Sequence, residues 1–130
     1  MNKYLVAGIV ALPTYVAGLV GLEAFSLFNS HPVTTQRELE ELVVAEKARL
    51  ECKAPIKPIL SSQGTARSLP KDAHGEYTLL VGELGANNRS IKHEVYHICK
   101  GHVDGEPSFL KYFFWNEPIT ALYEAFGIRF

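Results

Sequence analysis

Residues 93–97 read His-Glu-Val-Tyr-His, a spacing that has chemical meaning only if these residues lie on a helix. Two histidines four positions apart are about one turn apart on the same helical face, so their imidazoles can converge on one ion. Glu94 follows the first histidine and points toward the same side, close enough to act on water at that ion. The sequence therefore predicts a helix over about residues 88–101, with His93 and His97 facing a cleft.

A catalytic zinc site needs a third protein ligand and an open position for water. Three downstream residues are candidates: His102, Glu117 and Glu124. In the metzincin pattern the third histidine follows the second by six residues, and this chain has Val103 there. His102 misses that register by one, which favours a position behind the ligands or along the cleft.

The segment Asn116-Glu117-Pro118 begins nineteen residues after His97 and suits the start of a helix. This spacing resembles the glutamate helix of the gluzincins, the thermolysin-type metallopeptidases. The resemblance implies that His93, His97 and Glu117 bind one Zn²⁺ ion and that Glu94 is the general base. In that family an acidic residue four positions after the ligand glutamate usually supports the first histidine, whereas this chain has Ala121.

The stretch His-Ile-Cys-Lys-Gly-His also resembles the ImmA/IrrE-type peptidases, in which a glutamate from a helix rich in Ala and Phe is the third ligand. Glu124-Ala125-Phe126 fits that description, so Glu124 is the second choice for the ligand. In size and order of elements the chain also resembles the single-domain minigluzincins. All three resemblances rest on residues 88–127.

The resemblance implies a hydrolase, specifically a zinc metallopeptidase acting on peptides or proteins. Glu94 would take a proton from water activated by the metal and pass it to the leaving amine. Three residues are candidates for a transition-state helper or a support of the ligands: His102, Tyr112 and Tyr123. An extended substrate is expected to pair with one strand, formed by Tyr77, Thr78, Leu79, Leu80 and Val81. The alternative is a catalytically inactive, zincin-like binding or regulatory module at a membrane.

The remaining pattern predicts a small α+β, zincin-like domain over residues 35–130. Thr35 and Glu38 form a capping-box signature that begins a helix over about 35–52. Residues 54–62, with two prolines, suit an edge strand, and residues 76–83 are the strongest strand in the chain. These two strands are expected to form an antiparallel sheet, with a turn-rich segment over 63–75 between them.

The final helix is expected to have Asn116 as its cap, Pro118 in its first turn and Gly127 at its end. This helix carries both glutamates that are candidates for the third ligand.

Residues 4–22 are an uncharged, mostly apolar run about long enough to cross a bilayer as a helix. The sequence therefore predicts a single-pass membrane anchor over residues 1–28, contacting lipid through 4–28, with a cleaved signal sequence as the alternative. A linker over 29–34 follows. Lys3, close to the apolar run, favours placing the domain outside the cytoplasm.

The chain has 130 residues and a formal net charge of −1, which fits one domain and gives no electrostatic basis for binding nucleic acid. Its two cysteines, Cys52 and Cys99, are compatible with either a disulfide or two buried thiols.

Overall fold

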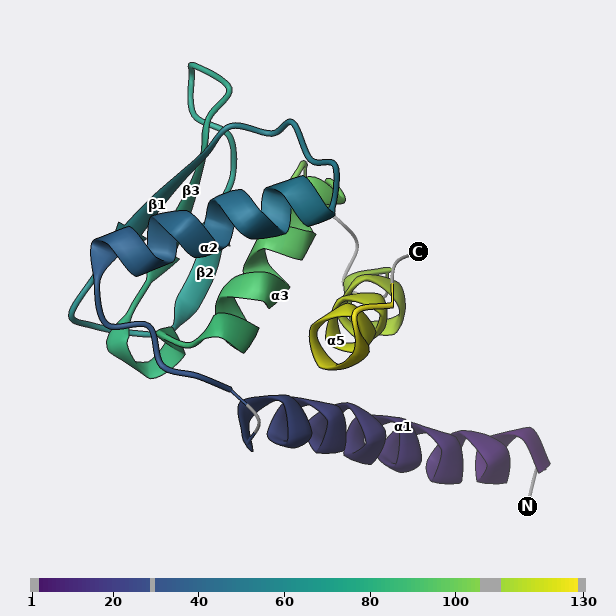
Figure 1. Ribbon diagram of the computed structural model, residues 1–130. Coiled ribbons are helices and arrows are strands. Elements are labelled where there is room, and N and C mark those ends of the chain that lie inside the picture. Colours follow the sequence, from purple (N-terminus) through teal and green to yellow (C-terminus); the bar gives the residue numbers. More distant parts are fainter. Residues whose placement is uncertain (1–2, 29, 106–110, 129–130) are drawn as a thin grey trace.

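The computed structural model describes residues 3–28, 30–105 and 111–128 and has the predicted α+β composition. Figure 1 shows helix α2 (Gln36–Arg49) and helix α3 (Asn88–Cys99) packed beside a small sheet, with helices α5 (Glu117–Phe126) and α1 (Lys3–Phe28) below them. Helix α2 contacts strand β1 (Ile56–Leu60), while α3 contacts the other two strands. The core lies between these helices and the sheet.

The predicted capping box begins helix α2. The Thr35 side chain accepts a hydrogen bond from the backbone N–H of Glu38, and the Glu38 carboxylate accepts one from the N–H of Thr35. Two of the four N–H groups that a helix leaves unpaired at its start are thereby satisfied. Leu39 and Val43 then fall on the buried face of the helix.

The sheet differs from the prediction in two ways. Its strand order is β1-β3-β2, and β1 runs parallel, not antiparallel, to strand β3 (Tyr77–Val81). Strand β2 (Ala66–Leu69) lies inside the segment expected to be only turns, and it pairs antiparallel with β3. Because β2 occupies one edge of β3, β1 pairs with the other edge. The expectation that residues 54–62 form an edge strand is confirmed.

Strand β3 leads into helix α3 through a short turn, η1 (Glu83–Gly85). A Cβ atom at Gly85 would lie 2.2 Å from the backbone nitrogen of Ala66, so only glycine allows this turn to approach the start of β2 so closely. Asn87 then caps α3, its side chain accepting from the N–H of Ser90 at 2.8 Å.

Helix α5 continues directly from a turn of π-helix, η2 (Tyr112–Asn116). The prediction that Asn116 caps α5 is wrong, because its backbone is already helical and its side chain makes no capping bond. Pro118 in the first turn and Gly127 in the left-handed region at the C-cap agree with the prediction.

Helix α1 packs along α5. The rings of Tyr15 and Phe114 are 5.3 Å apart, and those of Phe25 and Phe126 are 5.9 Å apart. Among the described residues, no helix has both the length and the apolar character needed to cross a membrane. The membrane span expected within residues 1–28 stays a prediction.

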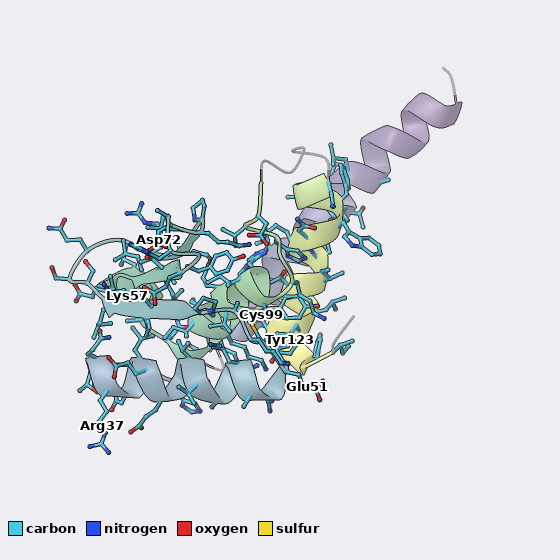
Figure 2. The ribbon with its side chains drawn as sticks, turned by 90° about the horizontal axis from the view of Figure 1, so that it is seen from above. Arg37, Glu51, Lys57, Asp72, Cys99 and Tyr123 are labelled. Carbon is cyan, nitrogen blue, oxygen red and sulfur yellow. A yellow bond between two sulfur atoms is a disulfide. The ribbon has the colours of Figure 1, made fainter. Side chains whose placement is uncertain are left out.

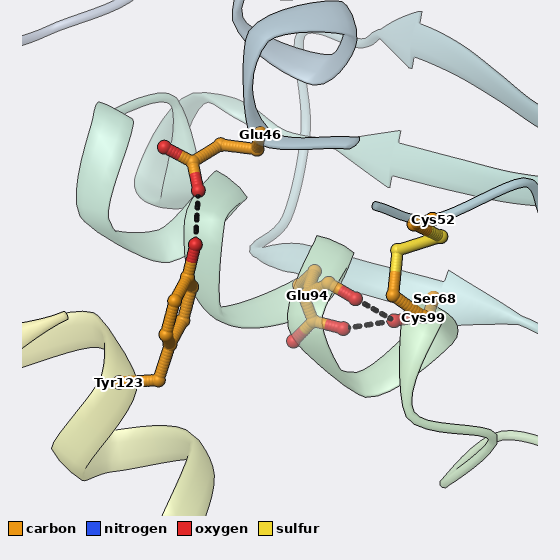
Figure 3. Close-up of a disulfide and its surroundings, with 6 residues drawn as sticks. All are labelled: Glu46, Cys52, Ser68, Glu94, Cys99 and Tyr123. Carbon is orange, nitrogen blue, oxygen red and sulfur yellow. Dashed lines mark hydrogen bonds between the residues drawn. A yellow bond between two sulfur atoms is a disulfide. The ribbon is translucent and has the colours of Figure 1, made fainter. Parts of the chain in front are cut away.

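Cys52 and Cys99 form a disulfide with 5.5 Å between their Cα atoms, which decides between the two alternatives for these cysteines. The bond joins the segment that follows α2 to the last residue of α3 (Figure 3). In Figure 2, Cys99 and Tyr123 lie among the packed helices, whereas Arg37 and Lys57 project from the outer surface.

Candidate metal centre

Three side chains converge where the last helix crosses the helix that carries the histidine pair. Nε2 of His93 and Nε2 of His97 are 3.1 Å apart. The two carboxylate oxygens of Glu117 lie 2.9 Å from Nε2 of His97 and 3.6 Å from Nε2 of His93. His97 is buried, while His93 and Glu117 are partly exposed. These three residues form a group that could hold a metal ion.

The spacing of these atoms fits a small, four-coordinate ion. Ligand atoms on a tetrahedral ion bound at about 2.1 Å are about 3.4 Å apart. The two Nε2 atoms are 3.1 Å apart, and the two separations that involve Glu117, 2.9 and 3.6 Å, are measured to its two different oxygens; these values lie on both sides of about 3.4 Å. Two imidazoles and one carboxylate are also a donor set that leaves a fourth position open.

Glu124 supports the first histidine and is not grouped with the ligand atoms. Its Oε2 lies 2.7 Å from Nδ1 of His93, and its side chain is only 2% exposed. A His93 ring that donates from Nδ1 to this carboxylate leaves Nε2 unprotonated and facing the ligand group. The structure thus places the second-choice ligand behind the site.

His102 lies behind the second histidine. Its Nδ1 is 2.9 Å from Nδ1 of His97. Burial, and then the nearby His97, lower the pKa of His102 to about 4, so its ring is neutral at pH 7. A neutral ring can accept a hydrogen bond from Nδ1–H of His97 and so hold that ring with Nε2 toward the ligand group. This is the supporting position that the sequence indicated.

The electrostatics of the site favour a cation. Burial acts to lower the pKa of His93, but hydrogen bonds and charge from Glu117 and Glu124 outweigh it and raise the pKa to about 10. Without a metal, His93 therefore carries a positive charge between two carboxylates. A divalent cation would meet the same two negative groups after displacing that proton.

Glu94 lies between two cavities at the site. One, of about 260 Å³, is lined by His93, Glu94 and Glu124, and the other, of about 230 Å³, by Glu94, His97 and His102. Ser68 of strand β2 donates a hydrogen bond from Oγ to Oε2 of Glu94 (Figure 3). The proposed base is therefore held at the border between the cleft and an edge strand.

The prediction that an extended substrate pairs with residues 77–81 is wrong. Tyr77, Thr78, Leu79, Leu80 and Val81 form the central strand, and both of its edges are already paired, with β1 and with β2. A peptide cannot add to a strand whose backbone groups are all taken. Strand β2 is the edge strand beside the cleft, since Ala66 and Ser68 line the two cavities.

Two tyrosines were candidates for a transition-state helper. Tyr123 is fully buried and its hydroxyl donates to Oε2 of Glu46 on α2 at 2.7 Å, so it joins two helices and does not reach into the cleft (Figure 3). The side chain of Tyr112 lies outside the residues that the structure describes in full.

Sequence reasoning missed Ser68. It stands in a short strand inside a polar segment, and nothing local marks it as a neighbour of Glu94, which is 26 residues away. The whole segment over residues 63–75 is predicted from the sequence to be rich in turns. In the folded chain, the residues of Ala66–Leu69 alternate between partly buried and exposed. The sequence of this segment does not reveal that alternation.

No protein-family model matches the chain, and no curated protein or solved structure is significantly similar to it.

Proposed function

We propose that this protein is a zinc-dependent peptidase. The observation that carries the proposal is the convergence of Nε2 of His93, Nε2 of His97 and the Glu117 carboxylate, with Glu94 lining one cavity beside His93 and another beside His97. In this proposal, Glu94 is the acid–base group, and His93, His97 and Glu117 are three ligands that leave one position open on the metal.

Zinc is the metal proposed because two imidazoles and a carboxylate, with an open position, are typical of catalytic zinc. A zinc ion bound there would polarise a peptide carbonyl and lower the pKa of water toward neutrality. Glu124 and His102 would hold the two imidazoles in the orientation that ligation requires.

Glu94 is the proposed general acid and base. As a carboxylate it accepts a proton from the attacking water, and it then returns that proton to the leaving amine. Its carboxylate lines the cavities on both sides of the site, so it can reach water and substrate in the cleft.

The proposed substrate is an extended peptide lying along the free edge of β2. Within the described part of the chain, strand β2 pairs on one side only, with β3, so the backbone groups on its other side face away from the sheet. A peptide can satisfy these groups by adding as a further strand. This position brings the peptide backbone to the strand that contacts Glu94.

Metal analysis tests the site. We expect purified protein reconstituted with zinc to hold about one ion per chain, and His97→Ala to lose it. His74→Ala is the matched control, because His74 is exposed in a loop away from the ligand group. Absence of zinc from the reconstituted wild-type protein would refute the proposal.

Activity against a peptide library tests the chemistry. Glu94→Gln keeps the size of the side chain and removes its basicity, so we expect it to retain zinc and to lose cleavage. Glu83→Gln, an exposed position on η1, should cleave like the wild type. Cleavage by Glu94→Gln at the wild-type rate would exclude Glu94 as the base, and zinc binding without any cleavage by the wild type would favour the inactive module.

A further inference from the structure

We infer that Ser68 is a positioning residue that couples the docking of a peptide on β2 to the placement of Glu94. The inference rests on the proposed peptidase function and adds a specific residue to it. It combines two features of Ser68: the contact of its side chain and the direction of its backbone.

The side chain of Ser68 holds Glu94. Its Oγ donates to Oε2 of the carboxylate and also lies 3.4 Å from the backbone oxygen of Glu94. Both residues are partly buried, so water competes for this hydrogen bond less than it would at an open surface. A bond between a hydroxyl and a carboxylate restricts the rotation of the glutamate side chain, which has several freely rotating bonds.

The register of the sheet sets the direction of the Ser68 backbone. The N–H of Gly82 donates to the C=O of Thr65, so the backbone groups of Thr65 point toward β3. In an antiparallel ladder, successive residues face the partner strand alternately. The backbone groups of Arg67 and Leu69 therefore point toward β3, as those of Thr65 do. The backbone groups of Ala66 and Ser68 point to the free edge of β2.

The central strand supports this register independently. The C=O of Val81 accepts from Ser61, and the N–H of Tyr77 donates to Pro55, both on the side of β1. Val81 is the register partner of Ala66, so its backbone faces away from β2. The residue paired with Ser68 is Leu79, two positions from Val81 along the strand, and its backbone groups face β1 for the same reason.

A peptide added to β2 would thus pair with the backbone of the residue whose side chain holds the base. Ser68 also lines the cavity shared by Glu94, His97 and His102. Ordering of β2 by a bound peptide would fix the Ser68 hydroxyl and, through it, the Glu94 carboxylate. The expected benefit is in the chemical step, since a positioned base raises kcat more than it changes substrate binding.

Steady-state kinetics of the zinc-loaded protein test this role. We expect Ser68→Ala to lower kcat about 10-fold or more, with KM within about a factor of two of the wild-type value. Ser68→Thr keeps a hydroxyl at this position and suits a strand, so it should recover most of the lost kcat. Ser62→Ala is the matched control, because Ser62 is exposed and outside β2.

A double-mutant cycle on the metal-free protein tests the contact without using activity. Ser68→Ala and Glu94→Ala should each change the melting temperature, and the double variant should change it by less than the sum of the two. Additive changes would show that the two side chains do not interact, and would overturn the inference.

The remaining outcomes are also decisive. A kcat for Ser68→Ala equal to that of Ser62→Ala would overturn the inference while leaving the peptidase proposal intact. Loss of zinc or of folding in Ser68→Ala, with Ser68→Thr failing to restore kcat, would assign Ser68 a structural role instead. A wild-type protein that binds zinc and cleaves no peptide would remove both the proposed function and this role.

Discussion

The Glu124 carboxylate lies 2.7 Å from Nδ1 of His93, and it stands seven residues after Glu117 on the same helix. Seven residues are about two helical turns, so both glutamates face α3. The resemblance to gluzincins placed a supporting acid four residues after the ligand, where this chain has Ala121. The support is present, one turn further along the helix.

Loss of this support should weaken metal binding without abolishing it. We expect Glu124→Gln to lower zinc affinity about 10- to 100-fold, because an amide orients the His93 ring less strongly than a carboxylate does. Competition with a zinc chelator measures the affinity. Glu83→Gln on the exposed turn η1 is the control, and equal affinities for the two variants would contradict the role of Glu124.

Helix α1 should contribute to the metal centre through its packing on α5. Leu19 and Leu22 line an apolar cavity with Pro118 and Leu122, and Pro118 directly follows Glu117, the proposed ligand. A charge at this contact should destabilise the docking of α5, so we expect Leu19→Asp to lower both the melting temperature and the zinc affinity. Val20 is 62% exposed, so Val20→Asp places the same charge in solvent and should have little effect on either quantity.

Tyr123 should stabilise the fold, not the chemistry. Its buried hydroxyl donates to Glu46, and removing it would leave a buried carboxylate with one partner fewer. We therefore expect Tyr123→Phe to lower the free energy of unfolding by about 1–3 kcal/mol, measured in urea, with little change in zinc content. A variant that unfolds like the wild type would show that this hydrogen bond contributes no net stability.

The same tyrosine should make the fold sensitive to alkali. Burial, and then the hydrogen bond to Glu46, raise the pKa of Tyr123 well above the ordinary tyrosine value of about 10. A raised pKa favours the protonated form in the folded state, so this stabilisation is complete below pH 10 and is lost as the pH rises through the folded-state pKa. Unfolding free energies measured over this range should fall less steeply for Tyr123→Phe than for the wild type.

The disulfide should be a major source of stability. Cys52 and Cys99 are separated by 47 residues, and the chain-entropy relation gives about 4 kcal/mol for a cross-link of this length. We expect the double variant Cys52→Ser, Cys99→Ser to lose a stability of that order in urea unfolding. Reduction of the wild-type protein should produce the same loss, and no change on reduction would contradict the prediction.

The sequence predicted well the features that depend on neighbouring residues. The start of α2 follows from Thr35 and Glu38, and the end of α5 follows from Gly127, because capping is chemistry within one turn. The pairing of His93 with His97 is equally local, since four residues are one turn. Glu117 came from the spacing of a known family, and the structure brings it to both histidines.

Features that depend on distant contacts were not predictable in this way. Strand β2 has four residues, and its sequence carries no strong strand signal; it exists because β3 offers it an edge. The parallel pairing of β1 follows from that choice. The roles of Ser68 and Glu124 depend on how β2 and α5 are placed against α3, which is set by packing and not by local pattern.

The disulfide also has a topological consequence. It closes residues 52–99 into a covalent ring that contains the whole sheet and both histidines, while Glu117 and helix α1 lie outside it. A metal held by all three ligands would therefore be a second cross-link, tying the C-terminal helix to the ring. Detachment of α5 alone would open the metal centre while the sheet and the histidine pair stay enclosed.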